Sequence, residues 1–261
     1  MQRFIFLLLC SFMMPWVAAG EEGKPVPYKV GALKMEGLYL KPTKPISPAR
    51  GVLVLHEWYG INDHTLQFSK WLQEAGYHVF VADLFGKTKR TKHPKEAESF
   101  VKERMAQPEQ SHAIFQKALE VLQTEAKLKI AQIAGVGFCF GGSSLIDALR
   151  RGVQLPAVAT FHANPATPFP IRLQEQKGRL LFVAGADDPF IPKAAVQQLI
   201  DESFAAKLRL ELHLLPRVKH SFTVAGATQM GHEHHLPFEY SPEATAEAKV
   251  LLLDFLGRSF Q

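Results

Sequence analysis

Cysteine is almost absent from this sequence: among 261 residues it occurs only at positions 10 and 139. Cys10 lies in a short apolar stretch, residues 4–14, which follows a basic N-terminus and precedes small residues, as in an export signal. We therefore expect residues 1–20 to be a signal peptide and the mature protein to be periplasmic or secreted. Cleavage would leave Cys139 without a partner, which excludes an internal disulfide and requires another explanation for this residue.

Long apolar runs and a strong charge imbalance are also missing. The stretch at 4–14 is short for a bilayer-spanning helix and is followed by Pro15, so we expect no stable membrane insertion after cleavage. The 30 Lys and Arg residues only slightly outnumber the 25 Asp and Glu residues. The densest basic segment, 87–95, has no interleaved aromatic residues or nucleic-acid motif, which argues against a nucleic-acid partner.

The sequence does contain a regular alternation of strand-like and helix-like segments. This pattern predicts an α/β fold, with a mostly parallel central sheet and helices on both faces. We expect residues 21–261 to form one such domain, because no internal repeat or second domain is indicated. The predicted strands are a hairpin at 28–40 that turns near Lys34, followed by 51–55, 77–82, 131–136, 156–161, 179–184 and 208–215. The predicted helices cover 63–75, 94–105, 108–127, 143–151, 192–204 and a last segment from 242, and Val196, Leu199, Ile200 and Phe204 share one face.

The segment Gly137-Phe138-Cys139-Phe140-Gly141-Gly142 lies between a predicted strand and a predicted helix. Glycines two residues before and two residues after Cys139 permit a sharp turn from strand to helix. Such a turn lifts the cysteine side chain above the sheet, at the positive N-terminal end of the helix. A buried, unreactive cysteine is the alternative interpretation. The position between two glycines favours a reactive thiol.

Two further residues at predicted strand ends can activate this thiol. Asp188 and His220 follow later strands, so the order along the chain is nucleophile, acid and histidine, as in α/β-hydrolases. The imidazole takes the thiol proton, and the carboxylate orients the imidazole. We prefer Asp188 to its neighbour Asp187 because Pro189 and Pro192 fix the turn around Asp188. Asp187 remains the alternative.

The segment His56-Glu57-Trp58-Tyr59-Gly60-Ile61-Asn62 follows the first buried strand. A loop at this position supplies one N–H of an oxyanion hole, and the residue after the nucleophile supplies the other. We therefore expect the backbone N–H groups of Trp58 and Phe140 to hold the oxyanion. Glu57 is a candidate proton partner for the thiol of Cys139. A structural carboxylate bonded to the backbone is the alternative for Glu57.

Five motifs together resemble those of the dienelactone hydrolase family and keep that family's order. They are GFCFGG at 137–142, HEWYGIN at 56–62, ADLFG at 82–86, DDPFIP at 187–192 and KHSF at 219–222. The resemblance covers nearly all of the mature chain and implies an α/β-hydrolase fold. It implies hydrolysis of a small ester or lactone through an acyl-cysteine intermediate, with no cofactor. It also assigns the triad to Cys139, Asp188 and His220, and the proton partner of the thiol to Glu57.

One expected feature of this family is missing. Members that act on anionic lactones carry a pocket arginine a few residues after the histidine, whereas residues 221–225 read Ser-Phe-Thr-Val-Ala. Neither Arg90 nor Arg104 aligns with the second pocket arginine. This argues against an anionic lactone and leaves the natural substrate open. The residues that we expect to line the substrate pocket are Tyr59, His162 and Phe222.

Other functions stay open at this stage. The chain is either a thioesterase or general carboxylesterase of the same fold, or a ligand-binding member without catalysis. A thiol redox sensor is disfavoured because no second cysteine can resolve a disulfide. The segment Gly231-His232-Glu233-His234-His235 contains zinc-binding residue types, but nothing at metal-site spacing completes the set. We expect a surface or pocket-rim loop there and no metal.

Overall fold

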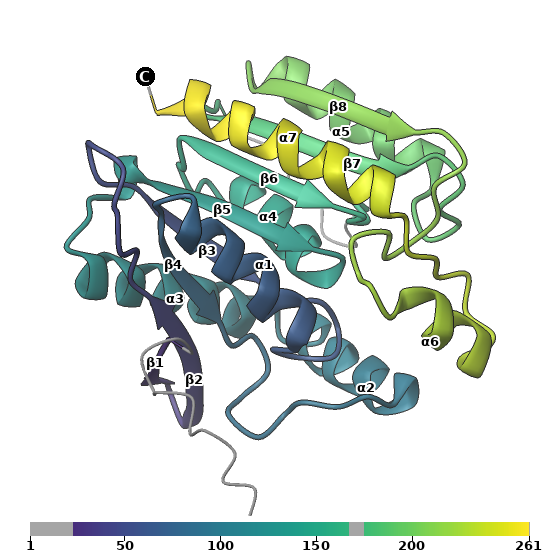
Figure 1. Ribbon diagram of the computed structural model, residues 1–261, viewed down its shortest axis with the longest axis horizontal. Helices are drawn as coiled ribbons and strands as arrows, with labels where there is room; N and C mark the ends of the chain where they lie inside the picture. Colours follow the sequence, from purple (N-terminus) through teal and green to yellow (C-terminus); the bar gives the residue numbers. More distant parts are fainter. Residues whose placement is uncertain (1–22, 167–174, 261) are drawn as a thin grey trace, which may run out of the picture.

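The computed structural model describes residues 23–166 and 175–260, and the described chain forms one eight-stranded sheet (Figure 1). The predicted signal peptide lies outside these residues. The strand order is β1-β2-β4-β3-β5-β6-β7-β8. Strands β1, β2 and β4 pair antiparallel, and every pair from β4 to β8 is parallel. The strands are β1 Lys24–Val30, β2 Leu33–Leu40, β3 Gly51–Leu55, β4 His78–Ala82, β5 Ile133–Phe138, β6 Ala157–Phe161, β7 Arg179–Gly185 and β8 Arg209–Leu215.

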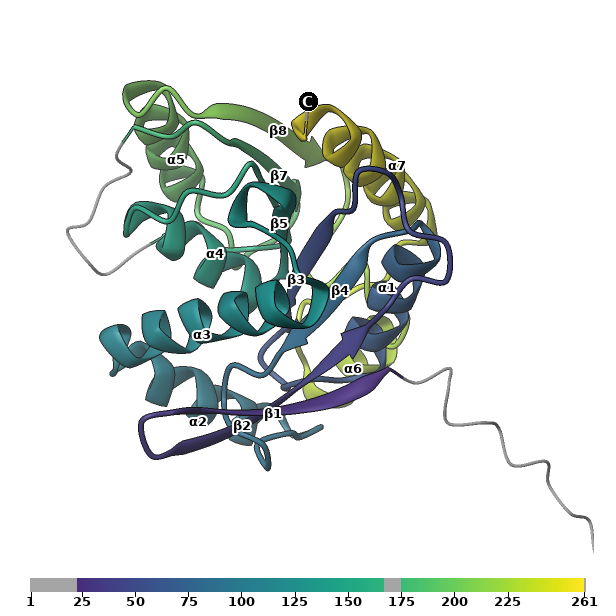
Figure 2. The ribbon, with the colours of Figure 1, turned by 90° about the vertical axis from the view of Figure 1, so that its left-hand side faces the viewer.

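Helices cover both faces of this sheet (Figures 1 and 2). Helices α1 and α7 pack on one face, and α3, α4 and α5 pack on the other. The predicted α/β fold with a mostly parallel sheet is therefore confirmed. The helices are α1 Asp63–Glu74, α2 Pro94–Met105, α3 Pro108–Ala126, α4 Phe140–Arg150, α5 Lys193–Ala205, α6 Ala227–His234 and α7 Pro242–Ser259, with a 3-10 turn at Ile130–Gln132.

The central strands are apolar throughout because both of their faces are covered. In β3, Leu53 and Leu55 pack into the cluster with α3 and α4, whereas Val52 and Val54 pack into the cluster with α1 and α7. Alternate side chains of a strand point to opposite faces, so a strand covered twice has no polar face. The continuous apolar run at 51–55 therefore has the structure that its sequence predicts.

Two helices begin at residues whose side chains cap the helix N-terminus. The side chain of Asn62 accepts a hydrogen bond from the backbone N–H of Thr65 at 3.0 Å, at the start of α1. The hydroxyl of Ser241 accepts one from Ala244 at 3.2 Å, at the start of α7. Each cap satisfies an N–H that has no partner inside the helix.

Two predictions for individual segments were wrong. The hairpin turns at Gly31 rather than near Lys34, because Gly31 adopts the left-handed conformation (φ 56°) that glycine tolerates. In α5, Leu199 is buried but Phe204 is 88% exposed. Ile200 is also 37% exposed, because the buried face of α5 consists of Ala195, Val196, Leu199, Glu202 and Ser203, and the face with Ile200 and Phe204 turns toward solvent.

Candidate active site

Cys139 occupies the turn between β5 and α4. Its backbone φ of 47° and ψ of −115° lie in a region that non-glycine residues seldom adopt, which is typical of strained functional positions. A Cβ atom on Gly137 would lie 2.6 Å from the carbonyl oxygen of Gly141, and one on Gly141 would lie 2.4 Å from that of Leu55. Both glycines are therefore required for the turn, which places the thiol at the N-terminus of α4.

The imidazole of His220 joins Cys139 to Asp188. Its Nε2 lies 3.3 Å from Sγ of Cys139, and its Nδ1 donates to Oδ2 of Asp188 at 2.7 Å. The other carboxylate oxygen of Asp188 accepts the backbone N–H of Phe190 at 2.9 Å, which fixes the carboxylate in place. Asp188 is buried, whereas its neighbour Asp187 is exposed. The structure therefore brings together the three residues of the preferred assignment.

The charges around His220 favour its protonated form. Burial alone would lower the pKa of this imidazole. The negative charge on Cys139 and the hydrogen bond and charge of Asp188 act in the opposite direction and raise the pKa to about 10. The rings of Phe190 and Phe238 flank the imidazole at 5.0 and 5.4 Å and limit its contact with water. The arrangement therefore favours a protonated imidazole beside Cys139 at neutral pH.

The expected oxyanion donors lie on either side of the nucleophile. Phe140 is the first residue of α4, so its backbone N–H has no acceptor within the helix. Trp58 lies in the turn after β3 and borders the same cavity as Cys139 and Phe140. This placement is compatible with an oxyanion hole formed by the two N–H groups.

Glu57 is buried directly behind this site. Its carboxylate lies 3.6 Å from Nδ1 of His64 and 3.8 Å from Nε2 of His162, and it accepts a hydrogen bond from Asn62 at 3.5 Å. Burial would raise the pKa of Glu57, but the charges of His64, His162 and His220 lower it to about 2. Glu57 is therefore ionised at neutral pH, and its role as the proton partner of the thiol stays a prediction.

Comparison with known proteins identifies the family of the chain. A model of the "Dienelactone hydrolase family" matches residues 35–260. The chain belongs to the dienelactone hydrolase family. Together with curated relatives named carboxymethylenebutenolidase, this membership indicates that the chain is a carboxylic ester hydrolase.

Several relatives of this dienelactone hydrolase family member are known. Carboxymethylenebutenolidase of Pseudomonas putida is 27% identical over 210 residues, which are 74% of this chain and 86% of that protein. The crystal structure of a dienelactone hydrolase-like promiscuous phosphotriesterase from metagenomic libraries is 25% identical, with a TM-score of 0.81, and covers 91% of this chain and 98% of that one. The structure of m3DLH shares the fold, with 24% identity, a TM-score of 0.82 and the same coverage.

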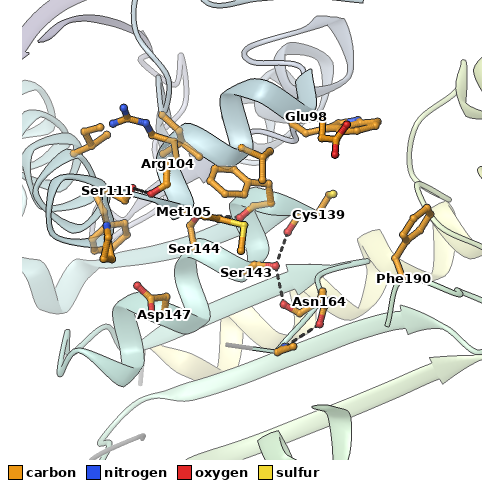
Figure 3. A pocket seen from close by; sticks show the side chains of 18 of the residues that line it. Glu98, Arg104, Met105, Ser111, Cys139, Ser143, Ser144, Asp147, Asn164 and Phe190 are labelled. Carbon is orange, nitrogen blue, oxygen red and sulfur yellow. Dashed lines mark hydrogen bonds between the residues drawn. The ribbon is translucent and has the colours of Figure 1, made fainter. Parts of the chain in front are cut away.

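A large cavity opens beside Cys139 (Figure 3). Its volume is about 620 Å³, and Cys139, His220 and Trp58 border it. Helices α2, α3 and α4 form most of its wall. The carbonyl end of a substrate placed in this cavity would therefore meet both the thiol and the imidazole.

The three residues predicted to line the pocket lie elsewhere. Tyr59, His162 and Phe222 are buried, and none of them borders the cavity. His162 shares a hydrogen bond of 2.9 Å with the hydroxyl of Thr223, and its ring contacts that of His220 at a centroid distance of 5.2 Å. The ring of Phe222 contacts that of His162 at a centroid distance of 5.5 Å, and the ring of Tyr59 contacts that of Trp58 at 4.9 Å, so these side chains pack beneath residues of the site.

Sequence reasoning missed the residues that do form the wall, among them Met105, Phe115 and Ala148. It also missed His64, the partner of Glu57. His64 lies in the first turn of α1. The sequence around it fits a solvent-exposed residue equally well, so it does not indicate the contact with Glu57. The only sequence feature that points to the wall of the cavity is the motif at 82–86, which lies at the end of β4 and is followed by α2 and α3.

The histidine segment at 231–235 is not the loop that we expected. Residues 227–234 form helix α6, which ends at His235 in the left-handed conformation (φ 52°). His232, His234 and His235 are exposed. Among the described residues of this family member, no group of three or more potential metal ligands comes together. In the same part of the chain, no helix is long and apolar enough to cross a membrane.

Proposed function

We propose that the protein hydrolyses a carboxylic ester or lactone through an acyl-cysteine intermediate on Cys139. The observation that carries this proposal is the continuous contact from Sγ of Cys139 through His220 to Asp188, at 3.3 and 2.7 Å. The relatives named as carboxymethylenebutenolidases act in the same chemical class and extend the proposal to lactones. A thioester would react by the same steps.

The reaction divides into acylation and deacylation. The thiolate of Cys139 attacks the substrate carbonyl, and the backbone N–H groups of Trp58 and Phe140 hold the oxyanion. The imidazolium of His220 gives its proton to the leaving oxygen as the carbon–oxygen bond breaks. Water then attacks the acyl-cysteine, and His220 takes a proton from this water. Release of the carboxylic acid restores the thiolate and the imidazolium.

Mass spectrometry can detect the intermediate directly. The protein is mixed with p-nitrophenyl acetate, quenched in acid and measured intact, and we expect an increase equal to one acetyl group that maps to the peptide containing Cys139. The Cys139→Ala variant serves as the control and should gain no mass. A protein that only binds ligands would show no adduct in either form, and a wild type without adduct under single-turnover conditions would contradict the proposal.

Within this mechanism, we assign an electrostatic role to Glu57. Because its carboxylate is ionised and faces the histidines behind the triad, it stabilises the imidazolium of His220. Such a carboxylate is a weak proton acceptor, so the ionised state favours this role over direct transfer of the thiol proton.

The Glu57→Gln variant tests this role. We expect kcat/KM to fall about tenfold or more, which corresponds to about 1.4 kcal/mol of lost transition-state stabilisation. We also expect the decline of activity at high pH to begin at a lower pH, because the imidazolium loses a neighbouring negative charge. Glu125→Gln, which removes only a surface ion pair with Lys24, is the matched control. A purely structural role would lower activity without moving the pH profile.

A further inference from the structure

The cavity beside Cys139 extends well beyond the triad, between α2, α3 and α4 (Figure 3). Helix α4 is 11 residues long, roughly 16 Å at 1.5 Å per residue, and it contributes residues to the wall from Phe140 to Arg150. The volume of about 620 Å³ is typical of sites that enclose drug-sized molecules. An acetyl group or a small lactone would fill only part of this space.

Apolar side chains dominate the wall. Ile114, Phe115 and Ala148 border the cavity and are buried from bulk solvent, so they form its floor. Met105 and Phe190 also border it, although they are 50% and 41% exposed, and they lie to opposite sides of Cys139 (Figure 3). Exposed large apolar side chains beside an apolar cavity mark a binding site for an apolar group.

Two arginines of the wall already pair with carboxylates of the protein. Arg104 donates to the carboxylate of Glu103 at 2.7 Å, and Arg150 donates to that of Glu202 at 2.9 Å. Burial lowers the pKa of His112, so its ring is uncharged at neutral pH. Lys95 is exposed at the edge of the cavity, and Nη2 of Arg150 has no hydrogen-bond partner among the described residues, so these are the two groups that a substrate carboxylate could meet. The apolar side chains that dominate the rest of the wall favour a neutral apolar group instead.

The position of His220 determines which part of the substrate enters this space. The imidazolium must reach the leaving oxygen, so the leaving group lies on the side of His220 and Phe238. The acyl group then extends away from His220. On that side the cavity runs along α4, past Ser144 and Ala148.

We propose that this cavity is an acyl-binding site, and that the substrate is an ester of a neutral, apolar acid of medium chain length. The proposal rests on the proposed function, because it takes Cys139 as the nucleophile that fixes the carbonyl end. The apolar acyl chain occupies the space between α2, α3 and α4, and its burial supplies the preference over short acids.

A series of p-nitrophenyl esters with one leaving group tests this substrate class. The acyl groups are acetyl, butyryl, octanoyl and octanoyl with a terminal carboxylate, all measured below their aggregation limits. We expect kcat/KM to rise at least tenfold from acetate to octanoate. Tenfold corresponds to about 1.4 kcal/mol, less than two fully buried methylene groups supply. The terminal carboxylate should lower the octanoyl value at least tenfold.

Two variants locate the effect in this cavity. Ala148→Phe fills the floor, and Met105→Glu places a charge at the exposed edge, where it does not disturb the core. Each is expected to lower the ratio of octanoate to acetate kcat/KM at least tenfold. Ala246→Phe, at an exposed position of α7 outside the cavity, is the matched control and should keep the wild-type ratio.

A wild type that prefers acetate, or that accepts the terminal carboxylate as well as octanoate, would overturn the acyl-site proposal. An unchanged ratio in Met105→Glu together with Ala148→Phe would do the same. Cys139→Ala separates the two proposals: if it retains octanoate turnover, the cysteine mechanism fails. If it is inactive while the chain-length preference is absent, only the acyl site fails.

Discussion

Replacing Cys139 by alanine is expected to lower kcat/KM for p-nitrophenyl esters by at least about 10⁴-fold, because it removes the thiol that contacts His220 and forms the acyl intermediate in the proposed mechanism. The cavity, the expected oxyanion donors and the imidazole all remain in this variant, so substrate binding should persist with little change. Steady-state kinetics measure the loss of activity. To measure the retained affinity, the inhibition constant of a non-hydrolysable ketone analogue for the wild type is compared with its dissociation constant for the variant.

The conservative variant Cys139→Ser separates the nucleophile from the space that it fills. A hydroxyl does not form an anion beside the imidazolium at neutral pH, so we expect most of the activity to be lost even though the side chain is nearly the same size. Both variants should melt within a few degrees of the wild type. Turnover by Cys139→Ala within tenfold of the wild type would contradict the assignment of the nucleophile.

The proximity of Cys139, His220 and Asp188 could be predicted because each of these residues carries a local signal. Cys139 lies between two glycines whose spacing indicates a tight turn, and Asp188 and His220 each follow an apolar strand. Parallel strands end at the same edge of the sheet, so residues far apart in sequence meet there without further information. The choice of Asp188 over Asp187 followed from the prolines of the same turn.

The wall of the cavity could not be predicted in this way. Helices α2 and α3 are amphipathic, and their sequences identify a buried face without showing which buried residues border a cavity and which pack against the sheet. Met105 reads as an ordinary surface residue and Ala148 as an ordinary core residue. Their common role depends on the distance between helices, which is a tertiary property.

The environment of Glu57 shows the same limit. The motif around Glu57 placed this carboxylate near the thiol. The sequence did not show that His64, from α1, and His162, from the end of β6, would lie within 4 Å of its oxygens. These contacts decide whether the carboxylate holds a proton, and so they decide between the electrostatic role and proton transfer.

The second large effect is expected for His220→Ala, which should lower kcat/KM about 10²- to 10⁴-fold, the usual contribution of a positioned acid and base. The variant also removes the imidazolium that favours the thiolate of Cys139. Alkylation by iodoacetamide at pH 6.5 should therefore be at least tenfold slower than in the wild type. The two measurements are independent, because alkylation reports only on the nucleophile and needs no leaving-group proton.

The dependence of activity on pH tests whether the protonated form of His220 is the active one. The pKa of His220 is raised to about 10, so the imidazolium is present below that pH and is lost above it. Acylation by the wild type should therefore stay constant through neutral pH and decline as the pH rises past about 10. Asp188→Asn removes one of the groups that raise the pKa, so its decline should begin at a lower pH, while the exposed Asp187→Asn should keep the wild-type profile. Equal profiles in both variants, or undiminished alkylation in His220→Ala, would show that the imidazole does not control the charge of the thiol.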